Sequence, residues 1–221
     1  MGGRRPRMIQ EKSSPRSRAI YIDIDDVLSH TIAALDDLLH QHHDRRVPYE
    51  SIKHFDLGIS FDLKADELRT FLALAHEPQT IKAISPVEGA VAGLEHWSKA
   101  GYEVRLVTGR PPTTEAATRH WLETHGVPHA SLAFVDKYGR AGGWTEDIPT
   151  LALSDIAKLD FCLAVEDSLE VAAFIAENLD IDVALVDHPW NRATEHLSSH
   201  VRDRLIRCHS WPEIIERFPQ P

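Results

Sequence analysis

The chain has 221 residues, 43% hydrophobic and 26% charged, enough to bury the core of one domain with a large insertion or of one domain plus a small one. Its net charge of −10 at pH 7 disfavours tight nonspecific binding to phosphate backbones, so nucleic acid is not expected as a partner. The only two cysteines, Cys162 and Cys208, form no CxxC pair, which favours a reducing, cytoplasmic compartment without a disulfide framework. No apolar stretch is long enough to span a membrane, so no membrane partner is expected.

Residues 1–18 carry six basic residues against the single acid Glu11, and they include no apolar segment of the kind found in secretory signals. Pro6 stands where an N-myristoylation signal needs Ser or Thr. We therefore expect a flexible basic tail before the folded chain.

Short apolar runs then alternate with helical patterns, which is typical of βαβ units on a parallel sheet. Strands are expected at residues 19–22, 104–107, 132–135, 161–165 and 183–186. Helices are expected over residues 86–101, 113–126, 149–160 and 168–180.

Residues 29–85 interrupt this alternation because they contain no convincing buried strand. Amphipathic helices are expected over residues 30–43 and 63–77, separated by an aromatic, turn-rich segment. We predict a small, mostly helical insertion standing over the sheet. The end of the chain, residues 196–218, predicts a helix and a packing tail in which Trp211 and Phe218 are buried.

Polar residues follow all five of the expected strands at the point where each ends. In chain order these groups are Asp23 and Asp25, then Thr108-Gly109-Arg110, Asp136-Lys137, Glu166-Asp167 and Asp187-His188-Pro189-Trp190-Asn191. The carboxyl ends of parallel strands meet at one edge of a sheet, where α/β proteins place their ligand sites. Clustered carboxylates favour a hard cation such as Mg²⁺, and a hydroxyl with an ammonium group suits phosphate oxygens. The pattern predicts a phosphoryl-transfer site.

Three of these segments resemble motifs of the haloacid dehalogenase (HAD) superfamily. "DIDDVL" at 23–28 resembles its first motif, DxDx[TV][LV]; "VRLVTGR" resembles the second, and "CLAVEDS" the fourth. The resemblance implies an α/β fold with a Rossmann-like parallel sheet flanked by helices. Residues 19–28 and 86–221 would form the core domain, and residues 29–85 a helical cap over the site.

The resemblance also implies roles for individual residues. Asp23 would be the nucleophile that forms an aspartyl-phosphate, and Asp25 the acid and then the base. Thr108, followed by Gly109, would bind the phosphoryl group. Mg²⁺ would be held by Asp23, the backbone carbonyl of Asp25 and Asp167, with Glu166 beside it. The aspartate at position 25 favours phosphate-ester hydrolysis over dehalogenation.

Two positions stay open at this point. The third motif of the superfamily is a lysine, and Lys137 is preferred for it because it directly follows a strand. The sequence separation between Lys137 and Glu166 is long for the family, so Lys158 remains the alternative. Arg110 would either contact the substrate phosphate or pair with a local acid.

Within the superfamily, the segments "SPVEGAVAGLEHW", "TGRPP", "VEDS" and "VALVDHPWNR" resemble the 5'(3')-deoxyribonucleotidase type. This implies a phosphatase acting on (deoxy)nucleoside monophosphates, with His54, Phe55 and Phe61 of the cap available to stack on a base. The alternatives are a HAD phosphatase for a sugar phosphate, another metabolite or a nucleic-acid 3'-phosphate, and a catalytically idle HAD domain that binds a partner. A homodimer is compatible with the sequence.

Overall fold

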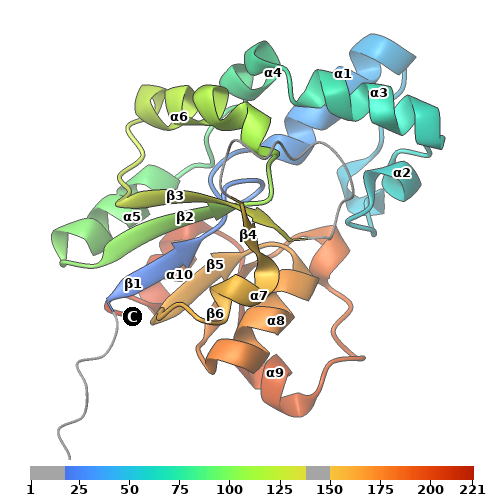
Figure 1. The fold of residues 1–221 in the computed structure, drawn as a ribbon. Helices are drawn as coiled ribbons and strands as arrows, with labels where there is room; N and C mark the ends of the chain where they lie inside the picture. Colours follow the sequence, from blue (N-terminus) through green and yellow to red (C-terminus); the bar gives the residue numbers. More distant parts are fainter. Residues whose placement is uncertain (1–17, 138–149) are drawn as a thin grey trace, which may run out of the picture.

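The structure is a computed structural model that describes residues 18–137 and 150–221. Within these ranges one parallel sheet of seven strands runs in the order β4-β3-β2-β1-β5-β6-β7, with helices on both faces (Figure 1). The strands are β1 (Ala19–Ile22), β2 (Glu103–Thr108), β3 (Ser131–Asp136), β4 (Leu151–Ala152), β5 (Leu163–Glu166), β6 (Val183–Val186) and β7 (Leu205–Cys208).

Alternate side chains of β1 divide the core into two layers. Ile20 and Ile22 belong to a cluster with α5 (Ala90–Lys99), α6 (Glu115–Thr124) and α10 (Trp211–Arg217). Ala19 and Tyr21 belong to a second cluster with α7 (Leu153–Ile156), α8 (Leu169–Leu179) and α9 (Ser199–Arg204). Because β1 is central and covered on both faces, each of its residues is buried.

Between β1 and β2 the chain forms α1 (Thr31–His43), η1 (Tyr49–Ser51), α2 (Leu57–Ser60), α3 (Ala65–Ala75) and α4 (Pro78–Ala83). We call residues 31–83 the helical insertion. It has its own apolar core, in which Leu39, Phe61 and Phe71 are buried, and it lies over one end of the sheet (Figure 1).

The two segments that join the helical insertion to the sheet lie side by side. The His30 N–H donates to the Ser85 carbonyl (2.9 Å), and the Val87 N–H donates to the Leu28 carbonyl (2.8 Å). This pairing lies where the sequence predicted the domain boundaries, although the division into two domains stays a prediction.

All five expected strands are present, as are the expected helices that became α1, α3, α5, α6 and α8. Two short strands were missed: β4 has only two residues, and β7 carries Arg207 in an edge strand. The helix expected over 149–160 is wrong for most of its described length, since β4 and the four-residue α7 replace it.

At the end of the chain, Trp211 is buried as predicted, whereas Phe218 is only partly buried. The connector η2 (Pro112–Thr114) precedes α6, and η3 (Pro189–Asn191) follows β6. The predicted basic tail lies outside the described residues apart from Arg18. Among the described residues, no helix combines the length and apolarity needed to cross a membrane.

Candidate active site

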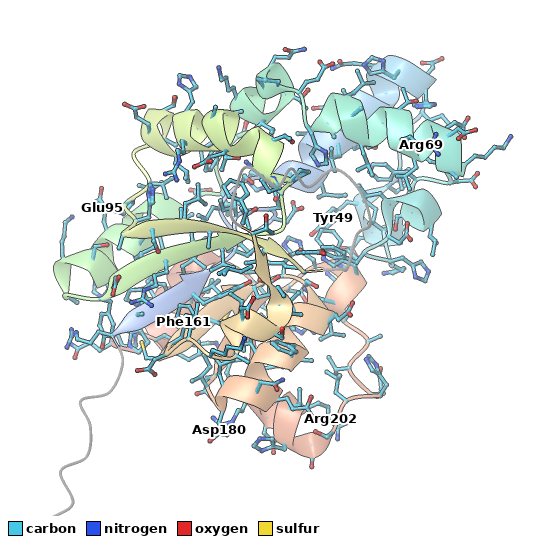
Figure 2. The ribbon with its side chains drawn as sticks, viewed as in Figure 1. Tyr49, Arg69, Glu95, Phe161, Asp180 and Arg202 are labelled. Atoms are coloured by element: carbon cyan, nitrogen blue, oxygen red, sulfur yellow. The ribbon has the colours of Figure 1, made fainter. Side chains whose placement is uncertain are left out.

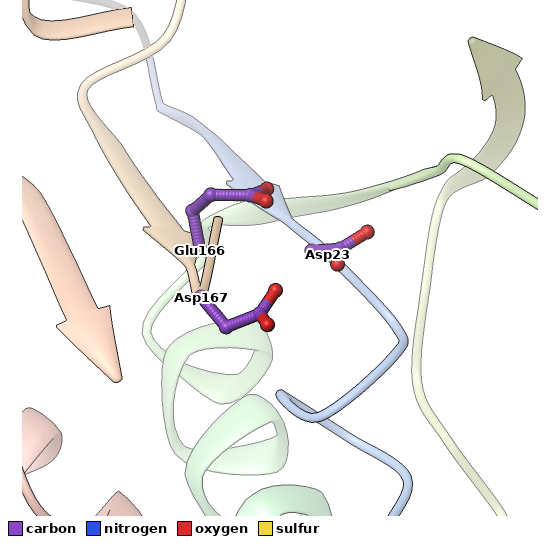
Figure 3. Close-up of side chains that lie close together, drawn as sticks. All are labelled: Asp23, Glu166 and Asp167. Carbon is purple, nitrogen blue, oxygen red and sulfur yellow. The ribbon is translucent and has the colours of Figure 1, made fainter. Parts of the chain in front are cut away.

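Asp23 is the first residue after β1, and its backbone fixes its place in the sheet. Its N–H donates to the carbonyl of Val165 on β5 (3.0 Å), which brings Asp23 beside the acidic pair that ends β5. Oxygen atoms of Asp23, Glu166 and Asp167 lie within 4.8 Å of one another (Figure 3). All three carboxyl groups are buried.

Lys137 follows β3 and supplies positive charge to this cluster. Its Nζ donates to Asp23 Oδ1 (2.7 Å) and to Glu166 Oε2 (3.0 Å), which also accepts the Tyr21 hydroxyl proton (3.0 Å). Lys158 instead forms an exposed ion pair with Asp155 (2.5 Å). The structure therefore places Lys137, and not Lys158, among the site carboxylates.

The acids of this cluster outweigh its one ammonium group. Burial raises the pKa of Asp23 to about 7, the Glu166 charge adds to that rise, and Lys137 opposes it. Burial also raises the pKa of Asp167, again with help from the charges of Glu166 and Asp23. Buried, mutually repelling carboxylate oxygens are the donor set that a hard divalent cation prefers. These residues fit a metal site.

Asp25 lies outside the group of three and faces a different cation. Arg110 donates to both of its carboxylate oxygens (Nη2 to Oδ1, 2.7 Å; Nε to Oδ2, 3.1 Å), and Thr31 Oγ1 donates to Oδ1 (2.6 Å). Burial alone would raise the pKa of Asp25, but the adjacent guanidinium and these hydrogen bonds lower it. Of the two roles left open for Arg110, the structure shows the pairing with a local acid.

Thr108 is fully buried at the end of β2. Its Oγ1 accepts the backbone N–H of Arg110 (3.1 Å), which folds the chain tightly around Gly109. Gly109 and Arg110 line the same cavity as Asp23. The second-motif segment therefore presents backbone as well as side chain to the site.

The site opens into a cavity of about 560 Å³ between the sheet and the helical insertion. Its polar end holds Asp23, Asp25 and Lys137, and the walls contributed by the helical insertion are mostly apolar. His54 and Phe55, two of the three residues expected to contact a base, line this cavity. Phe61 does not line it: it is buried in the core of the helical insertion, 5.7 Å from Phe71 between ring centroids.

The turn η3 supplies site contacts that the sequence analysis missed. Trp190 Nε1 donates to Asp167 Oδ2 (3.0 Å), and Asn191 Nδ2 donates to the Asp167 carbonyl (2.8 Å). The sequence places Asp187-His188-Pro189-Trp190-Asn191 at a strand end that converges on the site, but nothing local to this segment indicates a contact with Asp167. Tyr21 was also missed, although a tyrosine in a fully buried strand requires a hydrogen-bond partner.

A sequence profile described as "PITM 1-3, LNS2 domain" matches residues 69–181, just over half of the chain. The chain belongs to this LNS2 domain family. Its parallel sheet and flanking helices have the HAD-type Rossmann-like fold.

Two relatives carry nucleotidase names. A protein of Halalkalibacterium halodurans, named provisionally as a nucleotidase, is 24% identical over 192 residues, which cover 87% of this chain and 88% of that protein. A protein of Chlorobaculum tepidum, named provisionally as a 5'(3')-deoxyribonucleotidase, is 28% identical over 100 residues, 42% of this chain and 48% of that protein.

Solved structures share the fold at low identity. The protein tyrosine kinase A of Mycobacterium tuberculosis has a TM-score of 0.64 at 15% identity and covers 92% of this chain and 99% of its own. A phosphatase of Clostridium acetobutylicum, so named by prediction, has a TM-score of 0.60 at 10% identity and covers 94% and 100%. Because one fold hosts different chemistries, the activity has to be argued from the site.

Proposed function

We propose that this LNS2-family chain is a Mg²⁺-dependent phosphomonoester hydrolase that acts through an aspartyl-phosphate on Asp23. The observation that carries the proposal is the pair of buried carboxylates, Asp23 and Asp167, beside Lys137 at the carboxyl end of the sheet. Mg²⁺ held by Asp23, Asp167 and the backbone carbonyl of Asp25 would neutralise phosphate charge and orient the phosphoryl group.

In the first step, an Asp23 oxygen attacks phosphorus, the bond to the leaving oxygen breaks, and Asp25 gives that oxygen a proton. In the second step, Asp25 takes a proton from water, the water oxygen attacks phosphorus, and the bond to Asp23 breaks to release phosphate. Thr108 and Lys137 contact the transferring group. The Arg110 contact lowers the pKa of Asp25 in the free protein. A phosphate dianion beside Asp25 would raise that pKa again, so substrate binding itself favours the protonated Asp25 that the first step needs.

We propose the helical insertion as a cap that excludes water and selects the leaving group. The nucleotide is the favoured substrate for two reasons. The wall that the leaving group would meet is mostly apolar and carries Phe55, a face on which a base can stack. Two relatives, moreover, carry nucleotidase names. We further propose a cytoplasmic location, with which the two free cysteines are compatible. A homodimer stays a prediction.

The test is phosphate release from a panel of nucleoside and deoxynucleoside monophosphates, sugar phosphates and a 3'-phosphorylated oligonucleotide. Each substrate is assayed with Mg²⁺ and with chelator, for the native chain and for Asp23→Asn. We expect chelator-sensitive turnover that the variant loses, with nucleotides as the best substrates. Preference for a sugar phosphate would retain the phosphatase and reject the nucleotidase. Release by Asp23→Asn at the native rate would reject the mechanism, and no release from any substrate would favour a domain that only binds.

A further inference from the structure

The turn η3 lies where the helical insertion meets the sheet. The rings of His188 and Trp190 are stacked, with centroids 4.4 Å apart and planes 6° from parallel. Trp190 also packs against the apolar core of the helical insertion, and it lines the site cavity. One pair of rings therefore contacts both the insertion and the site.

On the side of the site, the Trp190 indole N–H donates to Asp167 Oδ2 at 3.0 Å. This bond fixes the rotation of the carboxylate and leaves Oδ1 for another ligand. Asn191 holds the backbone of the same residue, because its Nδ2 donates to the carbonyls of Asp167 (2.8 Å) and Val186 (2.7 Å). Side chain and main chain of Asp167 are therefore both positioned by η3.

On the side of the insertion, Tyr49 of η1 contacts the same rings. Its hydroxyl lies 2.5 Å from His188 Nδ1, and its ring meets Trp190 edge-on at 6.1 Å (Figure 2 labels Tyr49). His188 Nε2 lies 2.8 Å from the Asp26 carbonyl. A carbonyl only accepts, so Nε2 carries the proton. Burial lowers the pKa of His188 to about 4, so at neutral pH Nδ1 is an acceptor and Tyr49 is the donor.

The hydrogen bonds from Tyr49 to His188 and from His188 to the Asp26 carbonyl end on the loop that carries Asp25. Asp26 adopts a left-handed backbone (φ 53°) directly after Asp25, a conformation that needs support from its neighbours. Tyr49 thus reaches the loop that carries Asp25 through His188, and it reaches Asp167 through the stacked Trp190.

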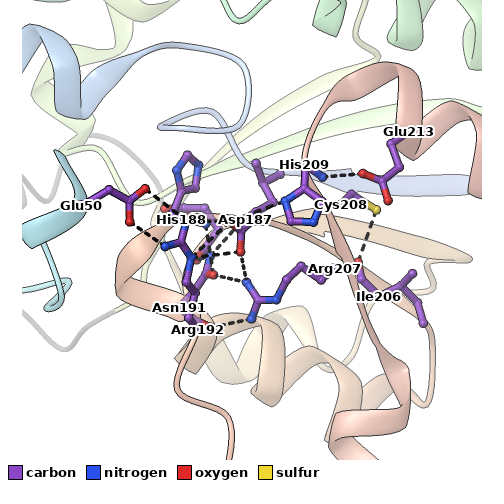
Figure 4. A network of polar contacts seen from close by, with 12 residues as sticks. Glu50, Asp187, His188, Asn191, Arg192, Ile206, Arg207, Cys208, His209 and Glu213 are labelled. Atoms are coloured by element: carbon purple, nitrogen blue, oxygen red, sulfur yellow. Dashed lines mark hydrogen bonds and ion pairs between the residues drawn. The ribbon is translucent and has the colours of Figure 1, made fainter.

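Ion pairs lie close to His188 (Figure 4). Arg192 bridges Glu50 of η1 (2.7 Å) and Asp187 (2.9 Å), and Arg207 also pairs with Asp187 (2.6 Å). The groups of the Glu50 pair are largely exposed, so this pair contributes little to stability. The ring contacts are the part of the interface that touches the site.

We propose that Trp190 is a positioning residue for the metal site and that Tyr49 couples the helical insertion to it through the His188–Trp190 stack. The proposal rests on the proposed function only in taking Asp167 as a metal ligand. With Tyr49 in place, the stack holds Asp167 in one orientation. Without Tyr49, the stack loses its contact with the insertion, and the orientation of Asp167 is held less firmly.

The first test is the calorimetric affinity of the chain for Mg²⁺ alone, without substrate. Trp190→Phe keeps a ring against His188 and removes the indole donor. We expect it to weaken Mg²⁺ binding about tenfold, the lower end of the range for hydrogen bonds that orient metal ligands. The matched control is Trp97→Phe, which removes an indole bond to the Phe218 carbonyl (2.8 Å) that involves no site residue. We expect it to bind Mg²⁺ as the native chain does.

The second test is Tyr49→Phe, alone and in the Trp190→Phe background. The control is Tyr102→Phe, because the Tyr102 ring lies against the Arg18 guanidinium (4.5 Å from the ring centroid) and does not line the site cavity. We expect Tyr49→Phe alone to weaken Mg²⁺ binding severalfold and to add nothing once Trp190 is replaced, because both act on the same carboxylate. Tyr49 is 42% exposed, so this variant keeps the test open should Trp190→Phe not fold.

Native Mg²⁺ affinity in folded Trp190→Phe, or no Mg²⁺ binding by the native chain, would overturn the positioning role. An equal loss from Tyr49→Phe in both backgrounds would overturn the coupling. Binding is measured without turnover, so a native chain that binds Mg²⁺ and hydrolyses nothing would reject the proposed function while leaving this proposal standing.

Discussion

Two clusters of charged side chains lie at neighbouring strand ends and differ in burial and in charge balance. At the ends of β1, β3 and β5, three buried carboxylates lie together, and the buried Lys137 pairs with two of them, Asp23 and Glu166. After β6, Asp187 and Glu50 meet Arg192 and Arg207, and the Glu50–Arg192 pair is largely exposed to water. The first cluster carries excess acid, whereas the second is balanced.

This difference in burial and charge indicates which of the two clusters is suited to bind a cation. Exposed ion pairs with balanced charge are compatible with a structural role. They contribute little to the free energy of unfolding, because water already solvates both partners. Buried carboxylates that outnumber their cations carry a free-energy cost that a bound metal ion would relieve. The burial of a side chain should therefore decide how much its substitution changes stability and activity. The substitutions below run from the largest expected effect to the smallest.

The largest effect is expected for Lys137→Met. The variant leaves Asp23 and Glu166 buried without their ammonium partner, so we expect phosphate release to be lost. The free energy of unfolding should fall by about 3–5 kcal/mol, measured by urea denaturation with chelator present. The matched control, Lys158→Met, removes only an exposed pair with Asp155, so it should change stability by less than about 0.5 kcal/mol. An inactive Lys158→Met beside an active Lys137→Met would reverse the assignment of the third-motif lysine.

Phe55 and Phe61 of the helical insertion extend the comparison to apolar side chains. Phe61→Ala empties a buried site and should cost about 3–5 kcal/mol of unfolding free energy. Phe55 is 42% exposed and lines the cavity, so Phe55→Ala should leave stability nearly unchanged. It should raise KM for a nucleotide, because base stacking on an aromatic ring is worth about 1–3 kcal/mol. The reverse pattern, with KM sensitive only to Phe61, would place the base elsewhere.

The excess acid predicts how the stability of the metal-free protein depends on pH. The pKa of Asp23 rises from 3.8 to about 7 on folding, so the folded protein keeps a proton that the unfolded chain releases. Stability from this group is full below pH 3.8 and is lost as pH rises to about 7. The buried His188, with a pKa lowered to about 4, acts in the opposite direction.

Comparison of the native chain with Asp23→Asn isolates this contribution. With chelator present, thermal unfolding should show the native chain losing stability relative to the variant as pH rises from 4 to 7. A difference that stays constant with pH would mean that Asp23 is not held as a buried, partly protonated acid.

The smallest effect is expected for Glu50→Gln in the balanced cluster. It removes the exposed contact with Arg192 and should cost less than about 1 kcal/mol of unfolding free energy, and less again at high salt. A loss as large as that of Lys137→Met would show that burial does not separate the two clusters.

The expected strands and most of the helices could be predicted because periodic apolar patterns report burial along one segment. The elements that were missed depend on neighbours. β7 pairs at the sheet edge with β6 over only four residues, Leu205–Cys208, one of which is Arg207. The pattern at 149–160 read as a helix because the pairing of β4 with β3, which interrupts it, cannot be seen in the segment alone.

By itself the sequence determined which chemistry-bearing residues lie at the strand ends. We could predict that one site contains Asp23, Thr108, Lys137 and Asp167, because the carboxyl ends of parallel strands meet at one edge of a sheet whatever the details of packing. The partners of these residues follow from the tertiary structure alone: Arg110 pairs with Asp25, Trp190 donates to Asp167, and Phe55 rather than Phe61 lines the cavity. Local patterns tell whether a side chain is buried, but its partners come from segments far apart in the chain, and packing alone brings those together.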